Sequence, residues 1–130
     1  MILFIADADG KAANRKEEFR RLEQLADQQP RPVKLLCCAA EQELEIWLLA
    51  GHPDKLRDLG QSWREMRAEV SVKERFFLPF LEEYGDPAVP SQGRERLMQE
   101  ALTNHEGIKS RCEELQELEN RIRAHIATLT

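Results

Sequence analysis

Two short and continuously apolar segments, joined by an amphipathic stretch, constrain the fold of this chain most strongly. The first covers residues 1–6 and the second lies within residues 33–40. Continuous apolar character is typical of strands that are buried on both faces, as in parallel sheets. A strand, a helix and a strand in this order form a βαβ unit with a right-handed crossover, so the two strands run parallel. Their carboxyl ends therefore share one edge of the sheet, where α/β proteins place ligands.

The segment between the strands has the pattern of one helix. Phe19, Leu22 and Leu25 recur at helical spacing. Asn14 and Glu17 have the spacing of an N-cap and its reciprocal partner, which predicts that the helix begins there and ends near Gln28, before two prolines. Four charged residues are expected to face away from the sheet: Lys16, Arg20, Glu23 and Asp27.

Everything after residue 40 is predicted to be helical. The helices are expected at 41–50, from Pro53 to Gly60, and near 63–69, 72–84, 92–103 and 111–128. Three of them open with capping boxes, Ser62 with Glu65, Ser71 with Glu74 and Ser110 with Glu113. The predicted fold class is α/β, a single domain over 1–130, with a βαβ core and following helix in 1–50 and a helical part in 51–130.

Two strands are few for a sheet, since three or more are normally needed for a sheet that stands alone. Either a further strand lies in a segment assigned as helical, or another chain completes the sheet, or a longer relative carries earlier strands. The unpaired sheet edge favours a homodimer or a partner subunit, with the first strand's edge or the C-terminal helices as the interface.

Composition limits the function classes. The 130 residues carry 19 Lys and Arg against 24 Asp and Glu, a net charge of −5, which argues against coating nucleic acid by bulk charge. There is no apolar run of membrane-spanning length and no basic region ahead of the first apolar run, so we expect neither a membrane span nor a signal peptide. Three cysteines without framework spacing fit reduced thiols, and a cytoplasmic location is expected.

The strongest chemical candidate follows the first strand. Asp7 and Asp9, ahead of Gly10, place two carboxylates at a strand end, where they can converge on one divalent cation. Mg²⁺ is held by one or two carboxylates together with water and substrate phosphates. Asp and Gly are also common turn residues, so the same pattern fits a strand that simply ends.

A second group of acids follows the second strand at the same predicted edge. Glu41, Glu43 and Glu45 alternate there, and Glu41 and Glu45 would share one helix face. They could complete an acidic metal cluster, although acids are common in first helical turns because of the helix dipole. Lys11 and Arg15 lie just after the Asp pair and could contact phosphates.

Other chemistries find little support. No P-loop, G-x-G-x-x-G or G-x-S-x-G motif occurs, and the cysteines and histidines lack zinc spacing. The first motif of haloacid dehalogenase phosphatases, D-x-D-G-T, resembles residues 7–11. Lys11 stands where that motif has Thr, and no later Asp pair follows, so this hypothesis ranks last.

Residues 2–10, ILFIADADG, resemble the D-x-D strand of Toprim (topoisomerase–primase) domains. Residues 38–50, CAAEQELEIWLLA, are similar to the E-x-W-L-L-A segment of small bacterial Toprim-like proteins related to OLD-type nucleases, as are the turn at 87–93 and the helix after Cys112. This resemblance implies a nuclease-type protein that acts on phosphodiester bonds with Mg²⁺ or Mn²⁺, and many members of the family serve in phage defence. It assigns the metal to Asp7 and Asp9.

One departure from the Toprim pattern affects catalysis. Toprim domains begin with an earlier strand ending in a Glu that serves in acid–base chemistry, whereas this chain begins at the D-x-D strand. Glu41 or Glu45 could substitute as the catalytic residue, a partner could supply the Glu, or activity has been lost. The alternative function is accordingly a non-catalytic interaction subunit of a larger defence complex.

Overall fold

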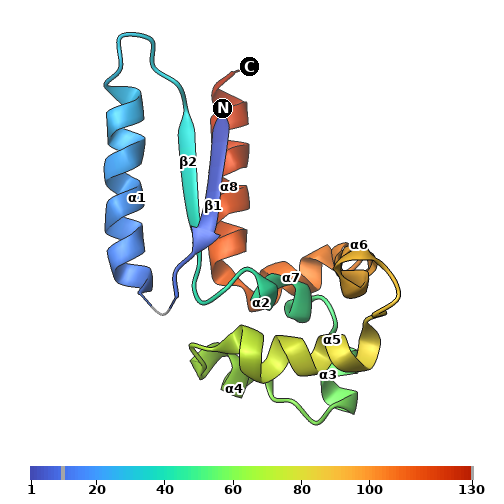
Figure 1. The fold of residues 1–130 in the computed structure, drawn as a ribbon. Coiled ribbons are helices and arrows are strands. Elements are labelled where there is room, and N and C mark those ends of the chain that lie inside the picture. Colours follow the sequence, from blue (N-terminus) through green and yellow to red (C-terminus); the bar gives the residue numbers. More distant parts are fainter. Residues whose placement is uncertain (10, 130) are drawn as a thin grey trace.

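The computed structural model describes residues 1–9 and 11–129, and it confirms the parallel βαβ unit. Strands β1 (Ile2–Asp7) and β2 (Leu35–Ala40) flank helix α1 (Ala12–Asp27). They pair in parallel, with Ile2 opposite Leu35 and Asp7 opposite Ala40. Within the described residues the sheet has only these two strands. The fold is thus mixed α/β, mostly helical, with a small parallel sheet (Figure 1).

One helix covers each face of β2. Alternate side chains of the strand point to opposite faces: Cys37 and Ala39 pack with Phe19 of α1, whereas Leu36 and Cys38 pack with Leu118 of α8 (Glu113–Thr128). The last helix of the chain therefore returns to the sheet that the first residues begin (Figure 1). Both helices pack chiefly against β2.

The remaining helices gather at the carboxyl ends of the strands (Figure 1). They are α2 (Glu45–Ala50), α3 (Pro53–Asp58), α4 (Trp63–Ala68), a π-helical segment (Lys73–Phe77), α5 (Leu78–Tyr84), a 3₁₀ turn (Pro90–Gly93), α6 (Arg94–Leu102) and α7 (His105–Arg111). A separate hydrophobic core joins them, in which Leu49, Phe77 and Phe80 are almost fully buried. None of the described helices is long and apolar enough to cross a membrane.

Some predicted helix starts are confirmed and others are wrong. Ser62 caps α4 as predicted, by accepting a hydrogen bond from the Glu65 N–H. Asn14 does not cap α1, which begins earlier because the Lys11 N–H turns back onto the Ala8 carbonyl (2.8 Å). Ser110 lies inside α7, where its hydroxyl donates to the Gly107 carbonyl (2.9 Å), so α8 starts after Cys112 instead.

The helix predicted over residues 41–50 begins only at Glu45. The preceding residues pair with the loop after β1: the Asp9 N–H donates to the Gln42 carbonyl (3.0 Å), and the Leu44 N–H donates to Asp7 Oδ1 (2.7 Å). These bonds hold the chain outside the helix. Glu41 and Glu45 consequently do not share a helix face, contrary to the prediction.

Gly51, which ends α2, provides a test of the packing between α2 and α6. A Cβ atom built on Gly51 would lie 2.5 Å from the Ala101 Cβ and 2.6 Å from its Cα. Gly60 differs, since its φ is +68° but nothing lies within 4 Å of such an atom. We expect Gly51→Ala to lower the free energy of unfolding in urea by about 2 kcal/mol or more through overpacking. Gly60→Ala should cost about 1 kcal/mol through backbone strain alone, and an equal or reversed ranking would contradict this packing.

Candidate functional site at the carboxyl edge of the sheet

The carboxyl edge of the sheet brings together acids from both strands. Asp7 ends β1, and Glu43 and Glu45 follow β2. Partial burial raises the pKa of the Glu43 carboxyl above its ordinary value, and the negative charges of Glu45, Glu74 and Asp7 raise it further. The Lys73 N–H, which donates to Glu43 Oε2 at 2.7 Å, acts in the opposite direction. These carboxylates are therefore close enough to repel one another.

Asp7 and Asp9 differ in how they are held. One oxygen of Asp7 accepts the Leu44 N–H, which leaves the other oxygen available. Asp9 is exposed and has a left-handed backbone, with φ of +50°. No side-chain partner of Asp9 exists among residues 1–9 and 11–129. Gly10, the last residue of the motif, lies outside the described residues.

A small hollow adjoins Asp9. Its volume is about 250 Å³, and it is lined by Ala8, Asp9, Lys11, Asn14, Arg15 and Glu18. Arg15 is paired with Glu18 at 3.1 Å, whereas the ammonium of Lys11 has no partner within the described part of the chain. Both predicted phosphate-binding residues thus lie beside Asp9, and Lys11 is the freer of the two.

Glu41 is directed away from this group. Its carboxylate pairs with Arg67 of α4 at 3.2 Å, and Arg67 also pairs with Glu114 of α8 at 3.0 Å. Glu114 is almost fully buried and in addition accepts the Trp47 indole N–H at 3.0 Å. Gln42 extends the network, since its side-chain oxygen accepts from Arg67 at 3.1 Å and its amide nitrogen donates to the carbonyls of Met66 and Glu69. The interactions of Glu41 are structural, and they occupy the group that acid–base chemistry would need.

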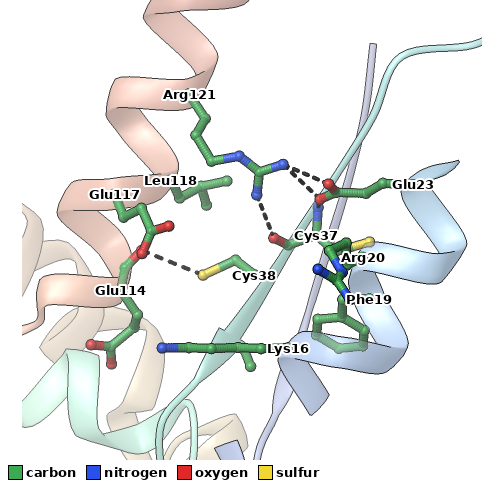
Figure 2. A pocket seen from close by; sticks show the side chains of 11 residues that line it. Lys16, Phe19, Arg20, Glu23, Cys37, Cys38, Glu114, Glu117, Leu118 and Arg121 are labelled. Carbon is green, nitrogen blue, oxygen red and sulfur yellow. Dashed lines mark hydrogen bonds and ion pairs between the residues drawn. The ribbon is translucent and has the colours of Figure 1, made fainter. Parts of the chain in front are cut away.

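A second hollow near the sheet lies elsewhere, along the outer edge of β2. It measures about 240 Å³ and is lined by α1, β2 and α8 (Figure 2). Lys16, Arg20 and Arg121 bring three positive charges to it, and Glu23, Glu114 and Glu117 bring three negative ones. The charges balance, so this hollow offers no net positive field to a phosphate.

Three of the charged residues predicted to face away from the sheet line this hollow instead. Figure 2 shows Lys16 reaching from α1 toward Glu114 and Glu117. Arg20 also lines the hollow, and Glu23 is partly buried against Cys37 and Arg121. The outward prediction is wrong for Glu23 because α8 returns beside α1, which the local helical pattern could not indicate, whereas Lys16 and Arg20 border the hollow and stay exposed.

The cysteines do not provide a nucleophile. All three are free and buried. Burial raises the pKa of the Cys38 thiol to about 11 and that of Cys112 to about 12, and the negative charge of Glu114 adds to both shifts. Thiols with such pKa values hold little thiolate at neutral pH, and thiolate is the reactive form.

Asp7 and Asp9 offer carboxylate oxygens, the donor type that a hard divalent cation takes. Among the residues that the structure describes, no group of three or more His, Cys, Asp or Glu side chains is arranged to hold a metal ion. Mg²⁺ needs only one or two carboxylates, because water and substrate phosphates complete its octahedron. The available oxygen of Asp7 and the unpartnered Asp9 match that requirement.

Comparisons with protein-family models, with curated proteins and with solved structures find no match.

A first test addresses the buried network. Arg67→Met should lower the free energy of unfolding by about 3–5 kcal/mol, because Glu114 is left buried without its cation. Arg57→Met is the matched control: its pair with Asp54 is highly exposed and should contribute less than about 1 kcal/mol. Chemical denaturation compares the two, and the double variant Arg67→Met/Glu114→Gln should recover part of the loss. Equal effects of Arg67→Met and Arg57→Met would contradict the structural role of the network.

A second test uses the raised pKa of Glu43. Because the folded-state pKa exceeds the ordinary value of 4.5, ionisation of Glu43 opposes folding at neutral pH. Glu43→Gln keeps an acceptor for Lys73 and should raise the melting temperature at pH 7. The gain should shrink as pH falls through the folded-state pKa and vanish below the unfolded one. Glu82→Gln, at an exposed carboxylate, should change little, and a Glu43→Gln gain independent of pH would contradict the raised pKa of Glu43.

Proposed function

We propose that the chain is a Toprim-like protein of the nuclease type, which acts on phosphodiester bonds with Mg²⁺ or Mn²⁺. The observation that carries the proposal is the meeting of Asp7, Glu43 and Glu45 at the carboxyl edge, with Asp9 and Lys11 on the adjoining loop. A metal ion at Asp7 and Asp9 would polarise a phosphoryl oxygen and lower the pKa of bound water.

The remaining roles follow from which groups are free. Lys11, with Arg15 behind it, is suited to contact a substrate phosphate and to offset the negative charge of the chain. Glu45 is the better candidate for acid–base chemistry, since Arg67 occupies Glu41 and no ion pair or hydrogen bond engages the Glu45 carboxylate in the described structure. A cytoplasmic setting belongs to the same proposal and rests on the three free cysteines.

A non-catalytic interaction subunit, as in a larger defence complex, is the second candidate. The observation that favours it is the exposure of β1, whose residues 2–5 are all apolar and all exposed. Such a strand invites pairing with another strand. In this alternative the acids at the carboxyl edge are only the polar ends of the two strands.

Two measurements on the same proteins separate the candidates. With Mn²⁺, the wild type should nick plasmid DNA or cleave RNA, and Asp9→Asn should reduce the rate by orders of magnitude, because a metal carboxylate contributes several kcal/mol to the transition state. Asp54→Asn removes an exposed, surface-paired Asp and should leave cleavage unchanged. Mn²⁺ should also raise the melting temperature of the wild type and of Asp54→Asn but not that of Asp9→Asn.

The outcomes distinguish the two functions. Clean wild-type protein that neither cleaves nucleic acid nor gains thermal stability from Mn²⁺ would overturn the nuclease proposal and favour the interaction subunit. Cleavage that survives in Asp9→Asn would indicate a contaminating nuclease and count against the assigned site.

A further inference from the structure

The two edges of the sheet are built differently. At the outer edge of β2, the Cys37 N–H donates to Glu23 Oε1 at 2.7 Å, and its carbonyl accepts from Arg121 at 3.1 Å. Arg121 and Glu23 are also paired with each other at 2.7 Å through both carboxylate oxygens (Figure 2). This ion pair takes the place that a neighbouring strand would have, so β2 offers no free edge at its centre.

The outer edge of β1 has no such cover. The N–H groups of Ile2 and Ala8 donate to carbonyls of residues 34 and 40, so the even-numbered residues of β1 turn their backbone toward β2. The backbone groups of Leu3 and Ile5 therefore point outward. In the described chain no strand lies beyond β1 to receive them. These donors and acceptors form a free pairing edge.

Apolar side chains surround this free edge. On α1, Lys16, Arg20 and Glu23 lie on the β2 side of Phe19, so helical geometry places Leu22 on the β1 side. On α8, Glu117 and Arg121 lie on the β2 side of Leu118, which places Ile126 on the β1 side. The β1-edge patch comprises Ile2, Leu3, Phe4, Ile5, Leu22, Leu25, Ile126 and Leu129, which are 37–71% exposed.

The patch is large enough for a stable interface. Taking about 180 Å² for a fully exposed residue of this size, these eight residues expose roughly 700 Å² in total. The two faces of the sheet share this area, since Ile2 and Phe4 point to the α1 face and Leu3 and Ile5 to the α8 face. A standard interface buries about 800 Å² on each partner, whereas the largest apolar patch of a typical monomer covers about 300–600 Å². An uncovered surface of this size is expected to be an interaction site.

We propose that the occupant of the β1-edge patch is a second copy of this chain, with the two β1 strands paired antiparallel about a two-fold axis at Phe4. A two-fold interface must be complementary to itself. Residues 2–5 meet this condition because they are all apolar, so no charge on one copy repels the same charge on the other. The pairing produces a four-stranded sheet in the order β2–β1–β1–β2, enough strands to be stable.

The register follows from the backbone directions. Centring the axis on Phe4 sets Leu3 of one copy opposite Ile5 of the other, so their outward N–H and C=O groups bond in pairs. It also sets the two Phe4 residues opposite each other in a non-hydrogen-bonded pair and keeps Asp7 at the end of the ladder. A register centred on Leu3 forms fewer hydrogen-bonded pairs. A register centred on Ile5 sets the charged Asp7 opposite the apolar Leu3.

Cysteine cross-linking tests this register. In a non-hydrogen-bonded antiparallel pair the Cα atoms are about 4.5 Å apart, within disulfide range. Phe4→Cys should therefore give a disulfide-linked dimer under mild oxidation, whereas Ile5→Cys, whose two copies do not face each other, should remain unlinked. The native cysteines are buried, so wild-type protein serves as the blank. Linkage of Ile5→Cys without linkage of Phe4→Cys would overturn the register.

Sedimentation tests the dimer without any covalent link. Wild-type protein should sediment as a dimer at micromolar concentration, and Leu3→Lys should raise its dissociation constant by about tenfold or more, because a charge on a strand edge opposes pairing. Val89→Lys places the same charge at an exposed apolar residue away from the patch and should leave the dimer intact. Circular dichroism checks that each variant is folded. A wild type that stays monomeric at high concentration, or equal effects of the two lysines, would overturn the proposal.

Discussion

The contact between Arg67 and Glu114 holds the two parts of the molecule together. Arg67 comes from the helical part, whereas Glu114 opens the helix that covers the sheet. Glu114 is almost fully buried, and the Trp47 indole and the Arg67 guanidinium satisfy its oxygens. A buried carboxylate is tolerated only with such partners. These charges fix the start of α8 beside α4, and the packing of Leu118 on Leu36 and Cys38 continues the contact of α8 with β2.

The two edges of the sheet differ in the side chains that surround them: charged at β2 and apolar at β1. Along β2, charged side chains from α1 and α8 close the strand and balance one another. Along β1, residues 2–5 are exposed because both helices pack chiefly on β2, although the Phe4 ring meets Phe19 of α1 edge to face. The acids at the carboxyl edge lie at the end of both strands. The proposed chemistry at that end and the proposed assembly along β1 therefore use different residues.

Local patterns in the sequence were sufficient for the positions of the strands, their parallel pairing, the body of helix α1 and the cap at Ser62. They were wrong about the burial of β1, whose residues 2–5 are exposed rather than buried on both faces. The apolar continuity of residues 2–5 and 35–39 decides strand formation within each segment. The environment of Glu41 could not be predicted, because its partner Arg67 is 26 residues away and belongs to another helix. The same holds for Glu23, which meets Arg121 across 98 residues. A charged residue on a helix looks solvent-exposed in sequence until the distant element that neutralises it is known.

The Glu23–Arg121 pair also limits how far sheets of this kind can grow. A strand with two open edges can template addition on both sides, and repeated addition leads to fibrils. Within residues 1–9 and 11–129, an added strand can join only on the β1 side, since side chains already bind the backbone of Cys37. Once a second copy has paired with β1, both outer edges of the enlarged sheet are closed β2 edges, so no further strand can be added. An exposed apolar strand at β1 therefore brings less risk of open-ended polymerisation.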